Sequence, residues 1–348
     1  MNRLRRSRLL DILESFKDLS IMVIGDFALD VYWYADMTRS ELSRETPRYT
    51  HPVVKETYSL GASGNICWNV KALGAREVFP VTIIGEDWRG QILKKNLEEN
   101  GILPEYVTTT PDRMTTVFIK PILCGWDSQQ EDSRIDFINY KPLSENLENR
   151  ILENVRSVIP RVEAIIVEDQ MIQNGIITDK VRESLINLAE KYPEKIFVAD
   201  SRMRIGLFRS MVLKPNRVEA VKAICPSKNP SEVGMDELVK IGNEIQRKAR
   251  RPVYITLSEE GALLIDESGH YHLPAAPTEP PIDPVGAGDT FIAAIGASLA
   301  AGASTVEAGI IANLAAGVIL KKLNITGTAS PEEILEKFDA ISVEDQWP

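Results

Sequence analysis

The sequence predicts an α/β fold in which a mainly parallel central sheet carries helices on both of its faces. Short apolar segments alternate along the chain with longer amphipathic segments, and this alternation is typical of such sheets. The chain has 348 residues, of which 44% are hydrophobic. That is enough to build one large domain with a small appendage. Two β-prone segments without helical periodicity, at 30–60 and 106–123, interrupt the alternation.

The apolar segments predict the strands of the central sheet, which in chain order are Ile21–Gly25, Val78–Gly85, Ala164–Asp169, Ile196–Asp200, Met211–Asn216, Val253–Leu257 and Ala262–Asp266. A short amphipathic helix is expected near the N-terminus, where apolar residues recur at helical spacing. The other helical patterns lie at 89–100, 146–159, 176–191, 217–224, 235–249, 288–301, 305–322 and 331–338. Several strands end in Gly, Asp or Asn. Because ligands of open α/β sheets bind beyond the carboxyl ends of the strands, we expect the functional site there.

The two β-prone segments are predicted to pair into a small β-sheet that covers one end of the central sheet as a lid. A lid of this kind excludes water from a reacting site. The lid would comprise 30–60 and 106–123, and the main domain 1–29, 61–105 and 124–348. The alternative is that both segments are surface loops with hairpins.

Composition limits the class of partner. The formal net charge is −10, which argues against nucleic acid as the main partner because a phosphate backbone requires clustered Lys and Arg. The three cysteines, Cys67, Cys124 and Cys225, form no C-x-x-C pair, so we expect a reducing, cytoplasmic compartment. No segment is long and apolar enough to predict a membrane span.

The segment from Ile282 to Gly302 contains the residues that we expect to take part in catalysis. It contains Gly286, Ala287, Gly288 and Asp289 at the start of an apolar helix. Small residues let backbone N–H groups approach an anion closely, and the first N–H groups of a helix have no partner within it. The helix dipole adds positive potential there. Such a cradle suits a phosphoryl group in transfer, and Asp289 is placed to accept a proton from an attacking hydroxyl. The alternative is a plain glycine turn capped by Asp289.

The stretch Asp283–Phe291 (DPVGAGDTF) resembles the C-terminal signature of the ribokinase/PfkB family of carbohydrate kinases. Four further motifs of that family match in the expected order, at Gly25–Asp30, Gly61–Asn65, Asn216–Glu219 and Thr256–Gly261. The resemblance covers about residues 18 to 335. It implies a ribokinase-like three-layer α/β/α sandwich with a small β-sheet lid, and a kinase that uses ATP and Mg²⁺.

A narrower resemblance concerns the substrate. The segment Ile21–Arg39 is similar to the start of the D-glycero-D-manno-heptose-7-phosphate kinase domain of bifunctional heptose kinase/adenylyltransferases, and Ile310–Ile334 is similar to the end of that domain. We expect no nucleotidyltransferase domain in this chain. Three departures stand out: Ala62 replaces the second of two paired glycines, Val285 stands where that group usually has Thr, and the loop at 36–48 differs.

The resemblance implies a role for each motif. Asp289 would be the general base, with Gly286, Ala287 and Gly288 as the anion hole. The residues expected to bind the sugar are Asp26, Asp30, Gly61 and Asn65. Asn216 and Glu219 would hold Mg²⁺ through water, although a helix cap with a first-turn acid is the open alternative. The nucleotide would be bound by Thr256, Gly261 and Asn313, and Asp283 marks a possible K⁺ site.

A substrate phosphate would need cations, because guanidinium groups bind phosphate in bidentate fashion. Arg39, Arg44, Arg202 and Arg204 are the candidates.

The sequence therefore predicts an ATP-dependent kinase that phosphorylates a hydroxyl of a sugar or sugar phosphate, with heptose 7-phosphate, at its anomeric hydroxyl, as the leading acceptor. Kinases of other pentoses, hexoses or nucleosides are the alternative, as is an inactive sugar- or nucleotide-binding regulator. A Rossmann dehydrogenase would require G-x-G-x-x-G after the first strand, and Gly25–Asp30 does not supply it. The resemblance further implies a homodimer formed through the lids.

Overall fold

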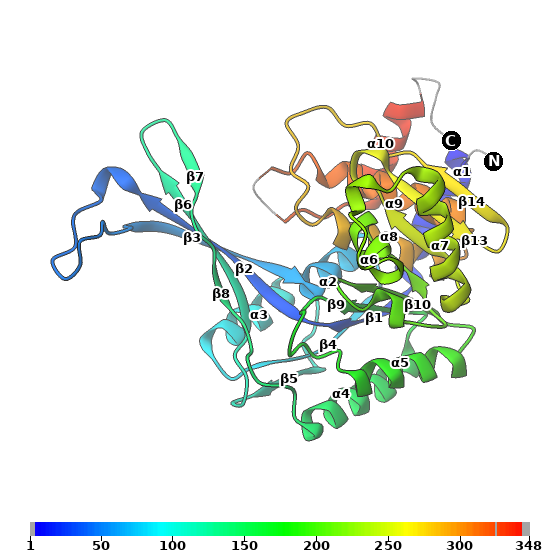
Figure 1. Cartoon of the computed structure of the whole chain (residues 1–348), viewed down its shortest axis with the longest axis horizontal. Helices are drawn as coiled ribbons and strands as arrows, with labels where there is room; N and C mark the ends of the chain where they lie inside the picture. The colour runs from blue at the N-terminus through cyan, green and yellow to red at the C-terminus, as the bar shows by residue number, and fades with distance from the viewer. Residues whose placement is uncertain (1–3, 324–325, 343–348) are drawn as a thin grey trace.

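The computed structural model describes residues 4–323 and 326–342, which form two sheets and the helices around them (Figure 1). The strands of the large sheet are β1 (Ser20–Gly25), β4 (Glu77–Gly85), β5 (Val107–Thr110), β9 (Ala164–Asp169), β10 (Ile196–Ser201), β11 (Val212–Leu213), β12 (Val253–Thr256), β13 (Ala262–Asp266) and β14 (Gly269–Leu273). Their order is β14-β13-β12-β11-β10-β9-β1-β4-β5. In this spatial order, every neighbouring pair between β12 and β5 is parallel. Strands β13 and β14 extend the β12 edge and pair in antiparallel fashion.

Helices cover both faces of the large sheet. One face carries α1 (Arg6–Ser15), α2 (Ser63–Ala72), α3 (Trp88–Glu99), α8 (Ala287–Ala300), α9 (Thr305–Ile319) and α10 (Pro331–Ser342). The other carries α4 (Glu145–Val158), α5 (Asp179–Lys191), α6 (Arg217–Ile224) and α7 (Met235–Ala249). None of these helices in the described part of the chain has the length and apolar character needed to cross a membrane.

Strand β1 shows why the central strands are apolar throughout. Ile21 and Val23 belong to the core on the α8 face, whereas Met22 and Ile24 belong to the core on the α5 face. Successive side chains of a strand point to opposite faces, so a strand covered by helices on both sides alternates between two cores and has no polar face. The three-layer α/β/α sandwich with a mainly parallel sheet is confirmed.

The smaller sheet projects from the body of the molecule as a long, narrow extension (Figure 1). Its strands are β2 (Phe27–Asp36), β3 (Val53–Ala62), β6 (Thr116–Cys124), β7 (Gln129–Glu131) and β8 (Ile135–Phe137), in the order β3-β2-β6-β7, with β8 also paired to β6. A single residue, Asp26, separates β1 from β2. The smaller sheet is therefore attached at the carboxyl edge of the large one, where the sequence predicts the site.

The strands differ in two places from the predicted lid boundaries. Strand β5 lies within 106–123 but pairs in parallel with β4 in the large sheet, because α3 provides the crossover between them. Strands β7 and β8 belong to the smaller sheet although they follow residue 123. Both are three residues long and mostly exposed, so they have no apolar alternation for sequence reasoning to detect. Helix α2 was also missed, since its first turn (Ser63–Asn65) reads as a polar glycine loop.

Candidate active site

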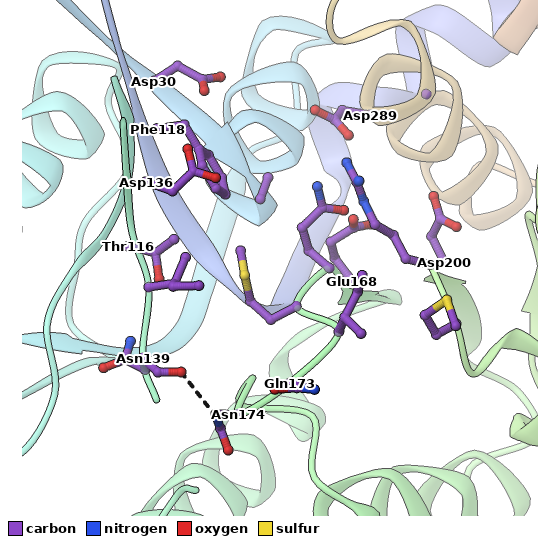
Figure 2. Close-up of a pocket in the computed structure, with 18 of the residues that line it drawn as sticks. Asp30, Thr116, Phe118, Asp136, Asn139, Glu168, Gln173, Asn174, Asp200 and Asp289 are labelled. Carbon is purple, nitrogen blue, oxygen red and sulfur yellow. Dashed lines mark hydrogen bonds between the residues drawn. The ribbon is translucent and has the colours of Figure 1, made fainter. Parts of the chain in front are cut away.

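A cavity of about 990 Å³ lies between the smaller sheet and the carboxyl ends of the large sheet's strands. Asp289 and Asp200 lie on one side of it, and Asp30 and Asp136 lie on the other (Figure 2). Strands β9, β10 and β11 each end at its wall, as does the first turn of α8. The cavity thus occupies the edge predicted from the Gly, Asp and Asn residues that end these strands.

Asp289 is the third residue of α8 and points into the cavity (Figure 2). The helix is preceded by Gly286, whose φ of 82° lies in the left-handed region that glycine adopts at little cost. A methyl group at Gly286 would lie 3.0 Å from the side-chain Nδ2 of Asn65. Gly288 also lines the cavity, whereas the N–H of Ala287 donates to the carbonyl of Pro284 at 3.1 Å. The Ala287 amide is therefore already engaged in a turn.

Asn65 holds Asp289 through a chain of side-chain hydrogen bonds. Asn65 Nδ2 donates to Asp289 Oδ2 at 2.7 Å. Asn65 Oδ1 accepts from Asn69 Nδ2 at 3.1 Å, and Asn69 Oδ1 accepts from the Thr290 hydroxyl at 2.6 Å. Because each amide has one donor end and one acceptor end, this chain fixes the Asn65 amide with its N–H toward Asp289. Asn65 thus orients the carboxylate instead of capping α2.

A buried lysine lies among the acidic groups beside Asp289. Lys214 Nζ is 2.7 Å from Asp200 Oδ2, and a methyl group at Gly288 would lie 3.7 Å from Lys214 Nζ. Burial lowers the pKa of Lys214, but the carboxylates of Asp200 and Glu219 outweigh burial and raise it above its ordinary value. Lys214 therefore keeps its charge next to the start of α8, where an incoming phosphoryl group would need it.

The pKa of Asp289 is raised to about 6. Burial is the main cause, because it disfavours the charged form. The hydrogen bond from Asn65 and the charge of Lys214 act in the opposite direction. A carboxylate with a pKa near 6 is ionised at neutral pH and is a better base than an ordinary aspartate, which is what a general base requires.

Oxygen ligands gather on the same wall. The buried Glu168 Oε2 and Asp200 Oδ1 have no hydrogen-bond partner, and an unpartnered buried oxygen normally indicates a ligand or water. Burial, followed by the charges of Asp200 and Asp289, raises the pKa of Glu168 well above its ordinary value. Within the ranges described, no three acidic, Cys or His side chains converge closely enough to form a metal cage. This oxygen-rich wall fits Mg²⁺, which keeps several waters and rarely has an all-protein cage.

Asn216 and Glu219 also line the cavity. They form a capping box at the start of α6: Asn216 Oδ1 accepts from the Glu219 N–H at 2.9 Å, and Glu219 Oε2 accepts from the Asn216 N–H at 2.8 Å. Burial is the main cause of a raised pKa at Glu219. The helix cap that the sequence left open is thus present, and it fixes Glu219 in the cavity wall with one oxygen still uncommitted to the cap.

Asp30 and Gly61 lie together on the smaller sheet. Asp30 lines the cavity on β2, and a methyl group at Gly61 of β3 would lie 3.1 Å from Asp30 Oδ2. Lys120 on β6 is 3.7 Å from Asp30 Oδ1. Burial raises the pKa of Asp30, and the charges of Lys120 and Arg134 oppose that rise. Gly61 therefore makes room for the Asp30 carboxylate, which faces the cavity beside a cation.

Asp26 does not line the cavity. Its two carboxylate oxygens accept hydrogen bonds from the backbone N–H groups of Met171 at 2.9 Å and Ile176 at 2.7 Å. These amides belong to the loop at 170–176, of which residues 170–174 line the cavity. Burial raises the pKa of Asp26 to about 6. The structure therefore gives Asp26 a role in holding a cavity loop, not in facing a sugar.

Three further sequence candidates, Arg39, Arg204 and Asp283, lie away from the cavity lining. Arg39 is exposed and pairs with Asp36 on the smaller sheet at 2.9 Å. Arg204 binds the buried Asp169 through both ends of its guanidinium group. Asp283 Oδ1 accepts from the Val285 N–H at 3.0 Å, in the turn before α8. Of the arginines predicted for a substrate phosphate, Arg202 is the one found in the cavity lining.

Of the predicted nucleotide residues, Thr256 ends β12 beside Asn216, Gly261 lies in the turn between β12 and β13, and Asn313 lies on α9. Thr256 donates its backbone N–H to Pro215 O at 2.9 Å. Gly261 has a φ of 88°, and a methyl group there would lie 2.2 Å from the carbonyl oxygen of Leu273. Asn313 Nδ2 donates to the carbonyls of Leu273 and Pro274, both at 3.0 Å. Gly261 and Asn313 therefore both fix the segment that follows β14.

The sequence profile of the pfkB family of carbohydrate kinases matches residues 18–332. The chain belongs to this family. Among curated proteins, this kinase is 30% identical over 330 residues to the bifunctional protein HldE of Wolinella succinogenes and 31% identical over 319 residues to that of Nitratiruptor. These alignments cover 93% and 91% of the chain, but 66% and 64% of the relatives. The pfkB kinase thus spans about two thirds of the length of these relatives, and 64% of the HldE of a Bradyrhizobium species.

Solved structures of other kinases share the fold of this kinase. Phosphofructokinase-2 from Escherichia coli in complex with potassium matches with a TM-score of 0.69 and 18% identity, over 93% of this chain and 99% of that one. Ribokinase from Arabidopsis thaliana complexed with ribose and ATP matches with a TM-score of 0.66 and 19% identity, over 92% and 98%. At these identities the likeness establishes the ribokinase-like fold.

Sequence reasoning missed several cavity residues of this pfkB kinase. They are Lys120, Glu168 and Lys214, together with Arg113 and Arg134 of the smaller sheet's side. A signal did exist for two of them. Glu168 directly precedes Asp169, the last residue of one predicted strand, and Lys214 lies two residues before Asn216, the last residue of another. The three cations on the side of the smaller sheet had no such signal. Lys120 lies on β6, Arg113 precedes β6 and Arg134 precedes β8, so their orientation depends on how β6 pairs with β2 and β8.

Proposed function

We propose that this carbohydrate kinase transfers the γ-phosphate of ATP to a hydroxyl of a sugar or sugar phosphate, with Asp289 as the general base. The observation that carries the proposal is the placement of Asp289 in the cavity at the start of α8, held by Asn65 and with a pKa near 6. A base that is ionised at neutral pH and lies at an electropositive helix start suits phosphoryl transfer.

In the proposed reaction the acceptor hydroxyl gives its proton to the Asp289 carboxylate while its oxygen bonds to the γ-phosphorus. The bond from that phosphorus to the oxygen bridging to the β-phosphate breaks, and ADP leaves with the electron pair. The first turn of α8 and the Lys214 ammonium lie where negative charge on the transferred group would be stabilised. Positioning and electrostatics supply most of the catalysis in such transfers.

Four side chains would hold Mg²⁺ through water: Glu168, Asp200, Asn216 and Glu219. When bound, the ion shields the charge of the β- and γ-phosphates. Asn216 and Glu219 are fixed by the capping box, and Lys214 balances the negative charge of the wall. Activation by K⁺ near Asp283 stays a prediction, as do the nucleotide roles of Thr256, Gly261 and Asn313 and the cytoplasmic location.

D-glycero-D-manno-heptose 7-phosphate, phosphorylated at the anomeric hydroxyl, is the proposed acceptor. The resemblance of Ile21–Arg39 to heptose-7-phosphate kinase domains and the alignments to HldE proteins support it. The alternative acceptors are another pentose, hexose or nucleoside. An inactive regulator is disfavoured because Asp289 and the pair formed by Asn216 and Glu219 are all present in the cavity wall.

Replacement of Asp289 by Asn tests the proposal. Because the amide cannot accept the hydroxyl proton, we expect Asp289→Asn to lower kcat by about 10³-fold or more, while the Kd for ATP stays within about threefold. Turnover is measured by ADP release with heptose 7-phosphate and with a panel of sugars, and ATP binding by calorimetry. Near-normal turnover of the variant would rule out Asp289 as the base.

A further inference from the structure

We propose that Phe118 is an aromatic platform on which the acceptor stacks through one C–H face of its ring, so that the enzyme takes its acceptor as a pyranose. The inference rests on the proposed kinase function and narrows its substrate class to six-membered sugar rings. None of the side chains to which the proposed function gives a role is aromatic.

Strand β6 turns its side chains alternately to the core and to the cavity. Val117 and Ile119 are buried in the core on the α8 face, whereas Thr116, Phe118 and Lys120 line the cavity. Over the residues that the structure describes, Phe118 belongs to neither core and is not one of the half-buried apolar side chains that pack against them. A large apolar ring that faces a polar cavity instead of a core indicates a ligand with an apolar face.

Two carboxylates flank Phe118. In the pairing of β6 with β2 and β8, Phe118 is the direct neighbour of Asp30 on one side and of Asp136 on the other. All three side chains line the cavity, on the side opposite Asp289 (Figure 2). Neighbouring strands lie about 4.8 Å apart, so the two carboxylates project from points about 10 Å apart with the aromatic ring between them. That interval accommodates a six-membered sugar ring and the hydroxyls at its edge.

This combination matches the chemistry of a pyranose. The chair form presents parallel axial C–H groups on a face, and these pack on the face of an aromatic ring, where the π-electrons carry negative partial charge. The sugar hydroxyls project at the edge, and a carboxylate there accepts hydrogen bonds and donates none. A furanose has fewer parallel C–H groups, and the edge of a nucleobase presents acceptors as well as donors. The platform and its flanking carboxylates therefore favour a pyranose over both.

One face of the Phe118 ring is already covered. Arg134 lies over the ring with its guanidinium carbon 4.8 Å from the ring centroid, and it donates to both oxygens of Asp136 at 2.7 Å. This fixed cation holds the ring in place from one side. No second aromatic or cationic group of the described chain stacks on Phe118. We therefore place the sugar on the opposite face of the ring.

The other aromatic side chains of this region are less suited to the role. Tyr32 and Tyr34 lie outside the cavity lining, and lysines lie over their rings. Trp33 packs against the core on the α8 face. Tyr140, which follows β8, does line the cavity, but it is 79% exposed and therefore lies at the cavity mouth.

The platform also selects one face of the sugar. Leaving the anomeric carbon aside, a manno-configured pyranose carries its one axial hydroxyl, at C2, on one face, and the other face presents the axial hydrogens of C3 and C5. Stacking on Phe118 uses the second face, because a hydroxyl directed at the aromatic ring would lose its hydrogen-bond partners. The hydrogens on C3 and C5 should therefore be those closest to Phe118.

The first test compares ring forms. Steady-state kinetics with MgATP would be measured with heptose 7-phosphate, with the pyranose mannose 6-phosphate and with fructose 6-phosphate, whose cyclic form is a furanose. The enzymes are the unaltered protein, Phe118→Leu, Phe118→Tyr and the control Tyr34→Leu. Tyr34 lies on β2 of the same sheet, outside the cavity lining, with Lys55 over its ring. Circular dichroism and thermal melts establish that each variant is folded.

The second test observes the stacked face directly. Saturation-transfer NMR would be recorded with heptose 7-phosphate and enzyme that is deuterated except in its phenylalanines, with irradiation of the aromatic protons. Phe118 is the one phenylalanine that lines the cavity in the described part of the chain. We expect the transfer to concentrate on the hydrogens at C3 and C5, and to be lost in Phe118→Leu.

We expect Phe118→Leu to raise the KM for the pyranose acceptors about tenfold, because leucine keeps an apolar contact but loses the flat stacking surface. The KM for ATP should change less than about twofold, and Phe118→Tyr and Tyr34→Leu should stay within about threefold of the unaltered enzyme. The unaltered enzyme should prefer mannose 6-phosphate to fructose 6-phosphate, and this preference should shrink in Phe118→Leu.

An unchanged acceptor KM in Phe118→Leu, or equal use of fructose 6-phosphate and mannose 6-phosphate, would overturn the platform and leave the kinase proposal standing. If no sugar is phosphorylated at all, the kinase proposal itself fails. If heptose 7-phosphate is the one acceptor that turns over, its KM values and its transfer pattern decide. Should Phe118→Leu not fold, the pattern in the unaltered enzyme decides, because transfer spread evenly over both faces of the sugar rules the platform out.

Discussion

The ionisation of Asp289 depends on its immediate neighbours. Burial raises its pKa, while Asn65 and Lys214 lower it, and the balance lies near 6. The proton is therefore more tightly bound in the folded chain than in the unfolded chain. The stability that this proton contributes is complete below the ordinary pKa of 3.8 and is lost as the pH rises through about 6. Activity follows the opposite course, because the base must be ionised.

We predict that kcat/KM falls below a pH of about 6, and that Lys214→Met moves this acid limb to higher pH. The lysine charge favours ionised Asp289, so its removal raises the pKa of that carboxyl group. The check is a pH–rate profile for both enzymes, with Lys214→Arg as the variant that keeps the charge. An acid limb that stays in place in Lys214→Met would show that Lys214 does not act on Asp289.

Two segments near the cavity have features that their secondary structure alone does not indicate: one has a strained backbone, and the other is held by side-chain hydrogen bonds. The first is the junction of β3 and α2, where Ala62 has φ 50° and ψ −132°. A side chain is strained in this region, and glycine, which the resembling family motif has at this position, would avoid the strain. The second is the loop at 170–176, which Asp26 and Arg204 hold from two sides.

Ala62→Gly should stabilise the protein by about 1 kcal/mol, because relief of the strained backbone outweighs the added flexibility of the unfolded chain. Urea unfolding followed by circular dichroism measures the difference. Ala72→Gly, at the end of the same helix, is the matched control and should destabilise by up to about 1 kcal/mol. A loss of stability in Ala62→Gly equal to that of the control would mean that the backbone at Ala62 is not strained.

Asp26→Asn should raise the KM for the acceptor while the KM for ATP changes little. The amide can accept only one of the two backbone hydrogen bonds that Asp26 accepts, so the loop at 170–176 loses part of its support. The associated loss of stability is about 1–3 kcal/mol. Initial-rate kinetics with each substrate varied in turn separates the two KM values. Equal increases in both would point to general disruption instead of a role in positioning this loop.

At the scale of the whole molecule, the smaller sheet extends from the body (Figure 1), and several large apolar side chains on this extension are exposed. Leu42, Tyr49, Val54 and Trp126 are all more than half exposed, and Trp126 reaches 89%. Exposed apolar groups that gather on one extension commonly mark an interface. This distribution supports the homodimer that the family resemblance implies.

We therefore predict a dimer in solution, with a mass twice the 38.8 kDa of the chain. Tyr49→Lys combined with Trp126→Lys should shift the equilibrium to the monomer, because a buried lysine without a partner is costly. Sedimentation velocity over a range of concentrations provides the measurement. Leu103→Lys is the control, since Leu103 is 73% exposed but lies outside the smaller sheet. A monomeric unaltered protein would remove the basis for this assembly.

The sequence by itself determined the layers of the fold and the start of α8. Apolar segments such as β1 and β9 are recognisable because a strand between two helical layers has no polar face. The run from Gly286 to Asp289 is recognisable because small residues before an apolar helix indicate an open helix start. Both signals are local: they depend on residues that are close together in the chain.

Only the tertiary structure decided which side chains meet. The hydrogen bond from Asn65 to Asp289 joins residues 224 positions apart, and the contact between Arg113 and Asn174 spans 61. The tertiary structure also showed that Asp26 supports the loop at 170–176 instead of facing the cavity, and that β5 belongs to the large sheet. Periodicity records which face of an element is buried. It does not record which distant element covers that face, because that choice depends on how the sheets pair and the helices pack.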